Sequence, residues 1–144
     1  MMYQILITSL TAGIIAQLSK LLIQSNKIKL DWRSVFSYAG MPSSHAAFVA
    51  SLATIIGLTQ NFYSPLFAIC LIFGLLVIRD ALGIRRYLGQ HGEIINILVK
   101  DLKEDKMLDE VYPKLLEKIG HTPAQIMAGT VLGILIGLAS FLIF

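Results

Sequence analysis

The residues best suited to chemistry are two histidines, His45 and His121, each at the start of an expected helix. Residues 40–45 read Gly-Met-Pro-Ser-Ser-His and residues 120–125 read Gly-His-Thr-Pro-Ala-Gln, so both segments combine a proline with hydroxyl-bearing capping residues. A helix N-terminus presents unpaired N–H groups and about half a positive charge, so two converging N-termini attract an anion. The same field keeps a nearby imidazole neutral and able to act as a nucleophile or a base. We expect an anion site in which the two histidines are candidates for the nucleophile and the proton donor of phosphoryl transfer.

Four basic residues are candidates for holding the phosphate of that site: Lys20, Arg33, Arg85 and Arg86. An alternative interpretation exists for Lys20, whose long side chain would extend to the membrane interface and bind nothing. For each histidine the alternative is a ring bonded to a backbone carbonyl, with the prolines and serines acting only as helix caps.

The charged residues fall in two segments of the chain. Five lie in 20–33 and sixteen in 79–118, which leaves 90 of the 144 residues in three stretches without Lys, Arg, Asp or Glu. Soluble domains carry about 25% charged residues, whereas the share here is 15%. This distribution excludes an ordinary soluble globule, a disordered tail and a nucleic-acid-binding module, and it indicates an integral membrane protein. The single cysteine, Cys70, excludes an intrachain disulfide and a cysteine metal cluster.

The uncharged stretches have the lengths of membrane-spanning helices, because a hydrocarbon core about 30 Å thick needs roughly 20 helical residues. We expect an all-α polytopic bundle of one domain, residues 1–144, with about four transmembrane helices at 3–24, 43–60, 65–84 and 123–144. An Asn-Phe-Tyr-Ser-Pro turn at 61–65 separates the second pass from the third. The alternative for 43–84 is a re-entrant hairpin, and the alternative for the first stretch is a cleaved signal peptide.

Four passes put both charged segments on one side of the membrane and both termini on the other. The first segment contains four Lys or Arg residues and the second contains eight, so the positive-inside rule places both segments, and the site, in the cytoplasm. Residues 85–120 are expected to form cytoplasmic surface helices, with apolar stripes over 94–102 and 108–119. Eight acidic residues balance eight basic ones in 79–118, as is typical of a solvated face.

Three glycines of the last helix, Gly129, Gly133 and Gly137, form two overlapping GxxxG patterns. Glycines at this spacing let a neighbouring helix approach closely. The neighbour is either a helix of the same chain or a second copy in a homo-oligomer, and the sequence leaves both open.

The two histidine segments resemble the second and third motifs of the type 2 phosphatidic acid phosphatase superfamily, a helical fold shared with vanadium haloperoxidases. The matching residues are Met41-Pro42-Ser43-Ser44-His45-Ala46, Gly120-His121-Thr122-Pro123, Ala128-Gly129 and Gly133. A divergent branch of small membrane proteins, described as haloperoxidase-related, is resembled more closely through Lys20, Asp31-Trp32-Arg33, Asp80-x-x-Gly83-Ile84-Arg85-Arg86 and Asn96. The resemblance extends from about Gln17 to Gly133, which is most of the chain.

This resemblance implies that His121 attacks phosphorus to give a phosphohistidine, that His45 protonates the leaving group, and that Ser44 donates a hydrogen bond to the phosphate. We expect the site to use no metal and no other cofactor. The residues expected to support the site are Asp80, Gln125 and Asn96.

The chain departs from the superfamily pattern at several positions. Gln125 stands where an aspartate is usual, and Leu115 stands where the third motif has an arginine. The first motif is absent, because Asn26 and Ser34 occupy the positions of its lysine and its proline.

We therefore expect a membrane phosphatase-like protein that hydrolyses a lipid phosphate or pyrophosphate. The alternative is a catalytically degenerate protein that binds a phosphate headgroup or assists membrane assembly. A small transporter is a third possibility, based on the polar face of the first helix. The expected partners are a phosphate-bearing lipid and the bilayer, with no nucleic acid.

Overall fold

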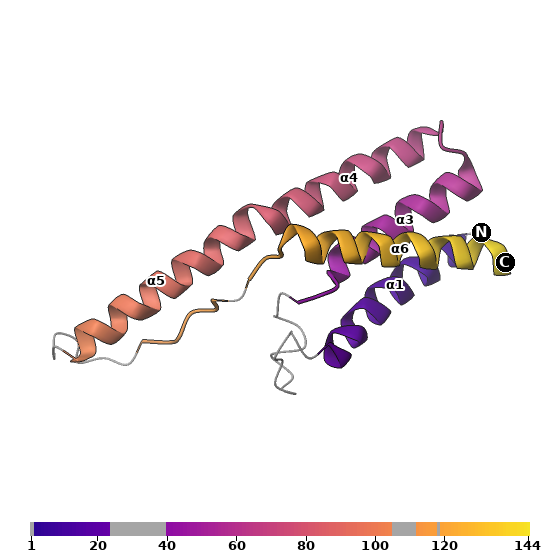
Figure 1. Cartoon of the computed structure of the whole chain (residues 1–144). Coiled ribbons are helices and arrows are strands. Elements are labelled where there is room, and N and C mark those ends of the chain that lie inside the picture. The colour runs from indigo at the N-terminus through magenta and orange to yellow at the C-terminus, as the bar shows by residue number, and fades with distance from the viewer. Residues whose placement is uncertain (1, 24–39, 105–111, 118) are drawn as a thin grey trace.

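The computed structural model describes residues 2–23, 40–104, 112–117 and 119–144. Five helices lie in these ranges: α1 (Met2–Leu22), α3 (Ser44–Gln60), α4 (Pro65–Leu82), α5 (Ile84–Glu104) and α6 (Pro123–Ile143). Figure 1 shows a helical bundle with one long helical arm, formed by α5. The expected fold class, an all-α membrane bundle, is confirmed.

Helix α3 is the centre of the bundle and packs against α1, α4 and α6, while α1 also contacts α6. Its small residues, among them Ala46, Ala47 and Ser51, are fully or almost fully buried. A second link joins α1 to α6, since the hydroxyls of Thr8 and Ser140 lie 2.6 Å apart. The helix placed in the interior is therefore the one whose small side chains let three neighbours approach.

The glycines of α6 pack against α3 of the same chain. A Cβ at Gly129 would collide with the carbonyl oxygen of Ser43, and a Cβ at Gly133 would collide with that of Ala47. A Cβ at Gly137 would lie 2.8 Å from the Cβ of Thr54. The stripe that the sequence left unassigned is thus used inside the chain, where backbone contact replaces side-chain packing.

Three of the helical stretches are long and apolar enough to cross a membrane: Tyr3–Leu22, Pro65–Leu102 and Pro123–Ile143. Helix α3, with 17 residues, is a shorter apolar helix held among the others. Large apolar side chains on the outer faces of α1, α4 and α6, such as Ile7, Ile72 and Leu135, are more than half exposed. Exposed apolar faces of this kind are suited to lipid, so the fold is that of an integral membrane protein.

Different chain segments lie at the two ends of the bundle. Both termini and the turn between α3 and α4 lie at one end (Figure 1). The end of α1, the starts of α3 and α6 and the end of α4 lie at the other. The chain segments that carry the candidate site are therefore brought to one end of the bundle.

Helix α5 continues from α4 after Gly83, and residues 112–117 return along it without forming a helix. The expectation of a surface helix through Leu115 was wrong for these residues. Two glycines on α5 let the returning backbone come close, because a Cβ at Gly92 would lie 2.7 Å from the carbonyl oxygen of Leu116. The side chain of Asn96 also bonds both the N–H and the carbonyl of Leu115, at 2.9 Å each, which gives this backbone partners outside a helix. The rest of the expected second stripe, 108–111, lies outside the described residues.

Candidate functional site

The two candidate histidines meet at one end of the bundle. The ring centroids of His45 and His121 are 6.0 Å apart, and the ring planes are inclined by 72°. His45 lies in the first turn of α3 and His121 stands two residues before α6 begins. Residues far apart in the sequence are thus placed at the N-termini of two adjacent helices, as an anion site requires.

Backbone and capping contacts hold these two N-termini together. The N–H of Ser43 donates to the carbonyl oxygen of Gln125 at 2.9 Å, which joins the start of α3 to the first turn of α6. The Ser43 hydroxyl caps α3 by accepting from the N–H of Ala46 at 3.3 Å. Gly129 leaves room for the Ser43 carbonyl, so the close approach depends on that glycine.

The ring of His121 is buried, and its backbone is fixed by a contact with α4. Its backbone N–H donates to the carbonyl oxygen of Ala81 at 3.0 Å, which ties the start of α6 to the end of α4. The residue is 7% exposed, and neither ring nitrogen has a hydrogen-bond partner among the described residues. A buried polar atom without a partner is costly, so this ring has an unused capacity to bind a ligand.

The surroundings of His121 keep its ring neutral. Burial, followed by the positive charges of Lys20, His45 and Arg85, lowers the pKa of His121 from 6.5 to about 4. A neutral imidazole at pH 7 has a free lone pair on one nitrogen. The ring therefore has the protonation state of a nucleophile.

Two of the expected cations lie close to the histidines. Lys20, in the last turn of α1, is 3% exposed, and its ammonium donates to the side-chain oxygen of Gln17 at 3.0 Å. Arg85, at the start of α5, pairs with Asp80 near the end of α4 at 2.5 Å. Both charges act on His121, and their burial differs, since the Arg85–Asp80 pair is partly exposed.

The remaining predicted site residues lie in different places relative to the histidine pair. Ser44 is half-buried and lines the same cavity as His45. The side chain of Arg86 is exposed, and its backbone packs against Gly120. Arg33 lies outside the described residues. Asn96 lies on the α5 arm, where it also donates to the Glu117 carboxylate at 2.9 Å.

Gln125 is engaged in capping α6. Its side-chain oxygen accepts from the N–H of Thr122 at 3.0 Å, and the Thr122 hydroxyl accepts from the N–H of Gln125 at 3.3 Å. This reciprocal pair is the capping box that an S/T-x-x-Q sequence predicts. The Gln125 side chain, which replaces the usual aspartate, is therefore bonded to backbone.

Some residues that build the site were not among the predicted site residues. Ser43 links the two helices, and the Ala81 carbonyl fixes the backbone of His121. Gly120 has φ of +86°, a conformation suited to glycine, and a Cβ there would lie 2.6 Å from the backbone nitrogen of Arg86. The glycine directly before His121 was the sequence signal that could have identified this position, because glycine commonly provides a positive φ beside a functional residue.

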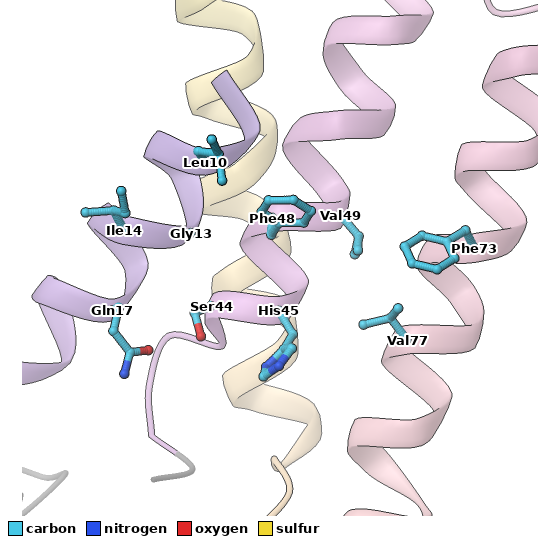
Figure 2. Close-up of a pocket in the computed structure, with 10 residues that line it drawn as sticks. All are labelled: Leu10, Gly13, Ile14, Gln17, Ser44, His45, Phe48, Val49, Phe73 and Val77. Atoms are coloured by element: carbon cyan, nitrogen blue, oxygen red, sulfur yellow. The ribbon is translucent and has the colours of Figure 1, made fainter. Parts of the chain in front are cut away.

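A cavity opens beside His45. It has a volume of about 490 Å³ and is lined from α1, α3 and α4. Figure 2 shows Gln17, Ser44 and His45 at one end of it and Leu10, Phe48 and Phe73 farther along. The polar end of the cavity thus lies at His45, whose ring centroid is 6.0 Å from that of His121, and the remainder is apolar.

The fold and this site define a helical membrane protein in which two helix N-termini bring a buried, neutral histidine close to a second histidine. Residues 1–136 match the model of the family described as the divergent PAP2 family. The chain belongs to this family, so the resemblance stated from its motifs is confirmed.

A relative supports the same membership. The chain is 39% identical over 143 residues to the uncharacterized membrane protein YuiD of Bacillus subtilis (strain 168), covering 92% of this chain and 90% of the relative. No solved structure matches the chain.

Proposed function

We propose that this protein hydrolyses a phosphate or pyrophosphate group of a membrane lipid through a phosphohistidine on His121. Its membership of the divergent PAP2 family supports a phosphatase-like membrane protein. The observation that carries the proposal is the ring of His121, which is buried, unbonded among the described residues, and 6.0 Å from the ring of His45.

The reaction has two steps. In the first, a neutral ring nitrogen of His121 attacks phosphorus and the P–O bond to the lipid breaks. His45, whose imidazolium form is favoured by the negative charge of the bound phosphate, gives its proton to the leaving oxygen. In the second, neutral His45 takes a proton from water, and the resulting hydroxide displaces His121 and releases phosphate. Each step leaves His45 in the form that the next step needs.

Several groups bind the phosphate in this proposal. The N-termini of α3 and α6 contribute their unpaired N–H groups, and Ser44 contributes a hydroxyl. Lys20 and Arg85 contribute positive charge, and both already act electrostatically on the His121 ring. Cations around the oxygens of a transferring phosphoryl group stabilise its transition state. Arg33 and Arg86 stay candidates for additional phosphate contacts.

We place this site on the cytoplasmic side of the membrane. The support is that all 12 lysines and arginines fall in the two charged segments. The first segment begins with Lys20 in the last turn of α1 and the second with Arg79 in the last turn of α4, both at the end of the bundle that holds the histidines.

The experiment that tests the proposal measures phosphate release by the purified protein in lipid nanodiscs. The substrates are a lipid phosphomonoester and a lipid pyrophosphate, with His121→Ala and His91→Ala as variants. His91 is exposed on α5 and is the matched control. Loss of release in His121→Ala with normal release in His91→Ala supports the proposal, and release that survives in His121→Ala contradicts it.

One observation favours the second candidate function, binding of a phosphate headgroup without turnover. Gln125 stands in place of a carboxylate and its side-chain oxygen is bonded to the backbone of Thr122. A carboxylate beside a catalytic histidine stabilises the imidazolium that forms during transfer, and Gln125 lacks the charge to do so. If the protein only binds a phosphate headgroup, we expect saturable binding of an anionic lipid, no phosphate release, and weaker binding in Arg85→Ala.

A further inference from the structure

Two apolar grooves flank α4 where it packs on α3. One lies between α1 and α4 and has a volume of about 490 Å³. The other lies between α4 and α6 and has a volume of about 460 Å³. Val49 of α3 lines both grooves and packs against Gly74 of α4, where an added Cβ would lie 3.5 Å from the Val49 Cβ. The bundle thus offers two grooves of similar size and apolar lining.

The two grooves differ at the end that holds the histidines. The lining of the α1–α4 groove includes Gln17, Ser44 and His45. In the described part of the chain, the lining of the α4–α6 groove includes none of the candidate site residues. At its corresponding end, the interface of α3, α4 and α6 is filled by one apolar cluster: Ala46, Ala81 and Ile126, with Ile78 and Leu82 against them. The first groove therefore continues into the candidate phosphate site, and the cluster separates the second groove from it.

The charges at the open end determine which molecule the first groove fits. Lys20 bonds to Gln17 of the groove lining, and Lys20 and Arg85 both act on the histidine pair. The opposite end, around Leu10 and Phe73, has only apolar side chains. An anionic head and an apolar tail in one molecule match this arrangement. The tail would cover apolar surface along about 10 Å of α1, from Gln17 to Leu10, at 1.5 Å per residue.

A glycine of α1, Gly13, is part of the lining of this groove. Gly13 of α1 faces Phe48 of α3, and a Cβ at Gly13 would lie 3.5 Å from the Phe48 ring. That distance is ordinary contact, so a small side chain fits at position 13 without strain. A leucine there would extend beyond that contact into the space between α1 and α4.

Resting on the proposed function, we propose that the ligand is a phosphate with a single long hydrocarbon chain, such as a long-chain alkyl or prenyl phosphate, and that its chain lies in the α1–α4 groove. Gly13 keeps that groove open. The two chains of a two-chain lipid diverge from one headgroup, and among the described residues His45 lines only the α1–α4 groove of the two. The second hydrocarbon chain of a two-chain lipid would therefore have no groove of its own. It would have to lie beside the first chain without contacting the protein.

The test uses alkylphosphonates, because their C–P bond is not hydrolysed and binding is measured whether or not the protein is an enzyme. Dodecylphosphonate and ethylphosphonate are titrated calorimetrically into nanodiscs that contain the wild type, Gly13→Leu or Ala53→Leu, with empty nanodiscs subtracted. Ala53 lines the other groove and is the matched control.

We expect Gly13→Leu to weaken dodecylphosphonate binding at least about tenfold, since excluding two buried methylenes already has that effect. Ethylphosphonate should bind both variants as it binds the wild type, and Ala53→Leu should bind dodecylphosphonate normally. Equal affinity of Gly13→Leu and the wild type for dodecylphosphonate would overturn the chain site, as would an equal loss in Ala53→Leu. Tighter binding of a two-chain phosphatidic acid than of a single-chain phosphate of the same chain length would overturn the single-chain class.

The result is separable from that of the hydrolysis assay. Binding that depends on Gly13 without any phosphate release supports the chain site and contradicts the proposed hydrolysis. Phosphate release from long-chain and short-chain substrates that is equally insensitive to Gly13→Leu supports hydrolysis and contradicts the chain site.

Discussion

The backbone N–H of Ser43 donates to the carbonyl oxygen of Gln125 at 2.9 Å, and this bond joins the starts of α3 and α6. Each partner also has a role in capping its own helix, Ser43 through its hydroxyl and Gln125 through its amide. The same contacts that begin the helices therefore set the separation of His45 and His121. Substitutions that disturb capping at this end should alter the site more than equivalent substitutions at the other end.

Loss of the Ser43 cap should damage the site as well as the fold. Ser43→Ala removes the acceptor for the Ala46 N–H, and Ser64→Ala removes the equivalent acceptor for the Phe67 N–H at the other end of the bundle. Both changes should cost about 1 kcal/mol of stability, measured by thermal unfolding in detergent. Only Ser43→Ala should also weaken phosphonate binding. An equal effect of the two variants on binding would contradict the link between this cap and the histidine pair.

Stability should fall in acid because of His121. The pKa of His121 is lowered to about 4 in the folded protein, from 6.5. A lowered histidine pKa contributes stability that is fully present above pH 6.5 and is lost as the pH falls toward 4, because the unfolded chain takes up the proton first. The difference in pKa corresponds to about 3 kcal/mol. The measurement is the unfolding midpoint between pH 7.5 and 4 for the wild type, His121→Gln and His91→Gln.

The expected outcome is a smaller acid-induced loss in His121→Gln than in the other two proteins. Identical pH profiles for all three would show that His121 is not buried in its neutral form.

Packing of α3 on α6 should be sensitive to Gly133. Gly133→Val places a branched side chain against the Ala47 carbonyl, whereas Gly13→Ala adds a methyl group where 3.5 Å is available. Overpacking of this kind typically costs about 1–3 kcal/mol, and Gly133→Val should lie at or above the upper end. Thermal unfolding in detergent measures both. If Gly133→Val were as stable as Gly13→Ala, this result would contradict the close packing of α3 against α6 at Gly133.

The α5 arm should depend on Asn96. Its side chain makes three hydrogen bonds to Leu115 and Glu117, so Asn96→Ala should release residues 112–117 from α5. Each bond contributes about 1 kcal/mol. Hydrogen exchange of this segment should rise while exchange in α3 and α6 stays the same. Lys100→Ala is the control, because its pair with Glu104 is exposed and contributes little. Unchanged exchange at 112–117 in Asn96→Ala would contradict the role of Asn96 in holding this segment on α5.

The proposed orientation is open to cysteine labelling. In a Cys70→Ser background, Tyr63→Cys lies in the turn between α3 and α4, where the native side chain is 95% exposed, and Lys100→Cys lies on the α5 arm. In intact cells, a membrane-impermeant maleimide should label position 63 directly and position 100 only after permeabilisation. The opposite pattern would place the histidine pair on the outer side.

Local sequence patterns were sufficient for the helix starts and for the fold class. Thr122 and Gln125 predicted a capping box that the structure contains, and the uncharged stretches predicted a membrane bundle. These features depend on residues close together in the chain, or on composition alone. Residues 112–117, which return along the α5 arm, were predicted incorrectly as part of a helix, because their apolar residues fit a helical period as well as an extended segment. What excluded the helix was contact with Asn96 and Gly92, far away in sequence.

The sequence alone therefore determined that this is a helical membrane protein with two histidines at helix starts, since burial of apolar surface in lipid and satisfaction of helix ends are set locally. Only the tertiary structure decided that Gly129 and Gly133 face α3 of the same chain, that the Lys20 ammonium is buried, and that the rings of His45 and His121 lie 6.0 Å apart. These facts depend on how whole helices pack. Packing is decided by the fit of several surfaces at once, so a single segment does not encode it.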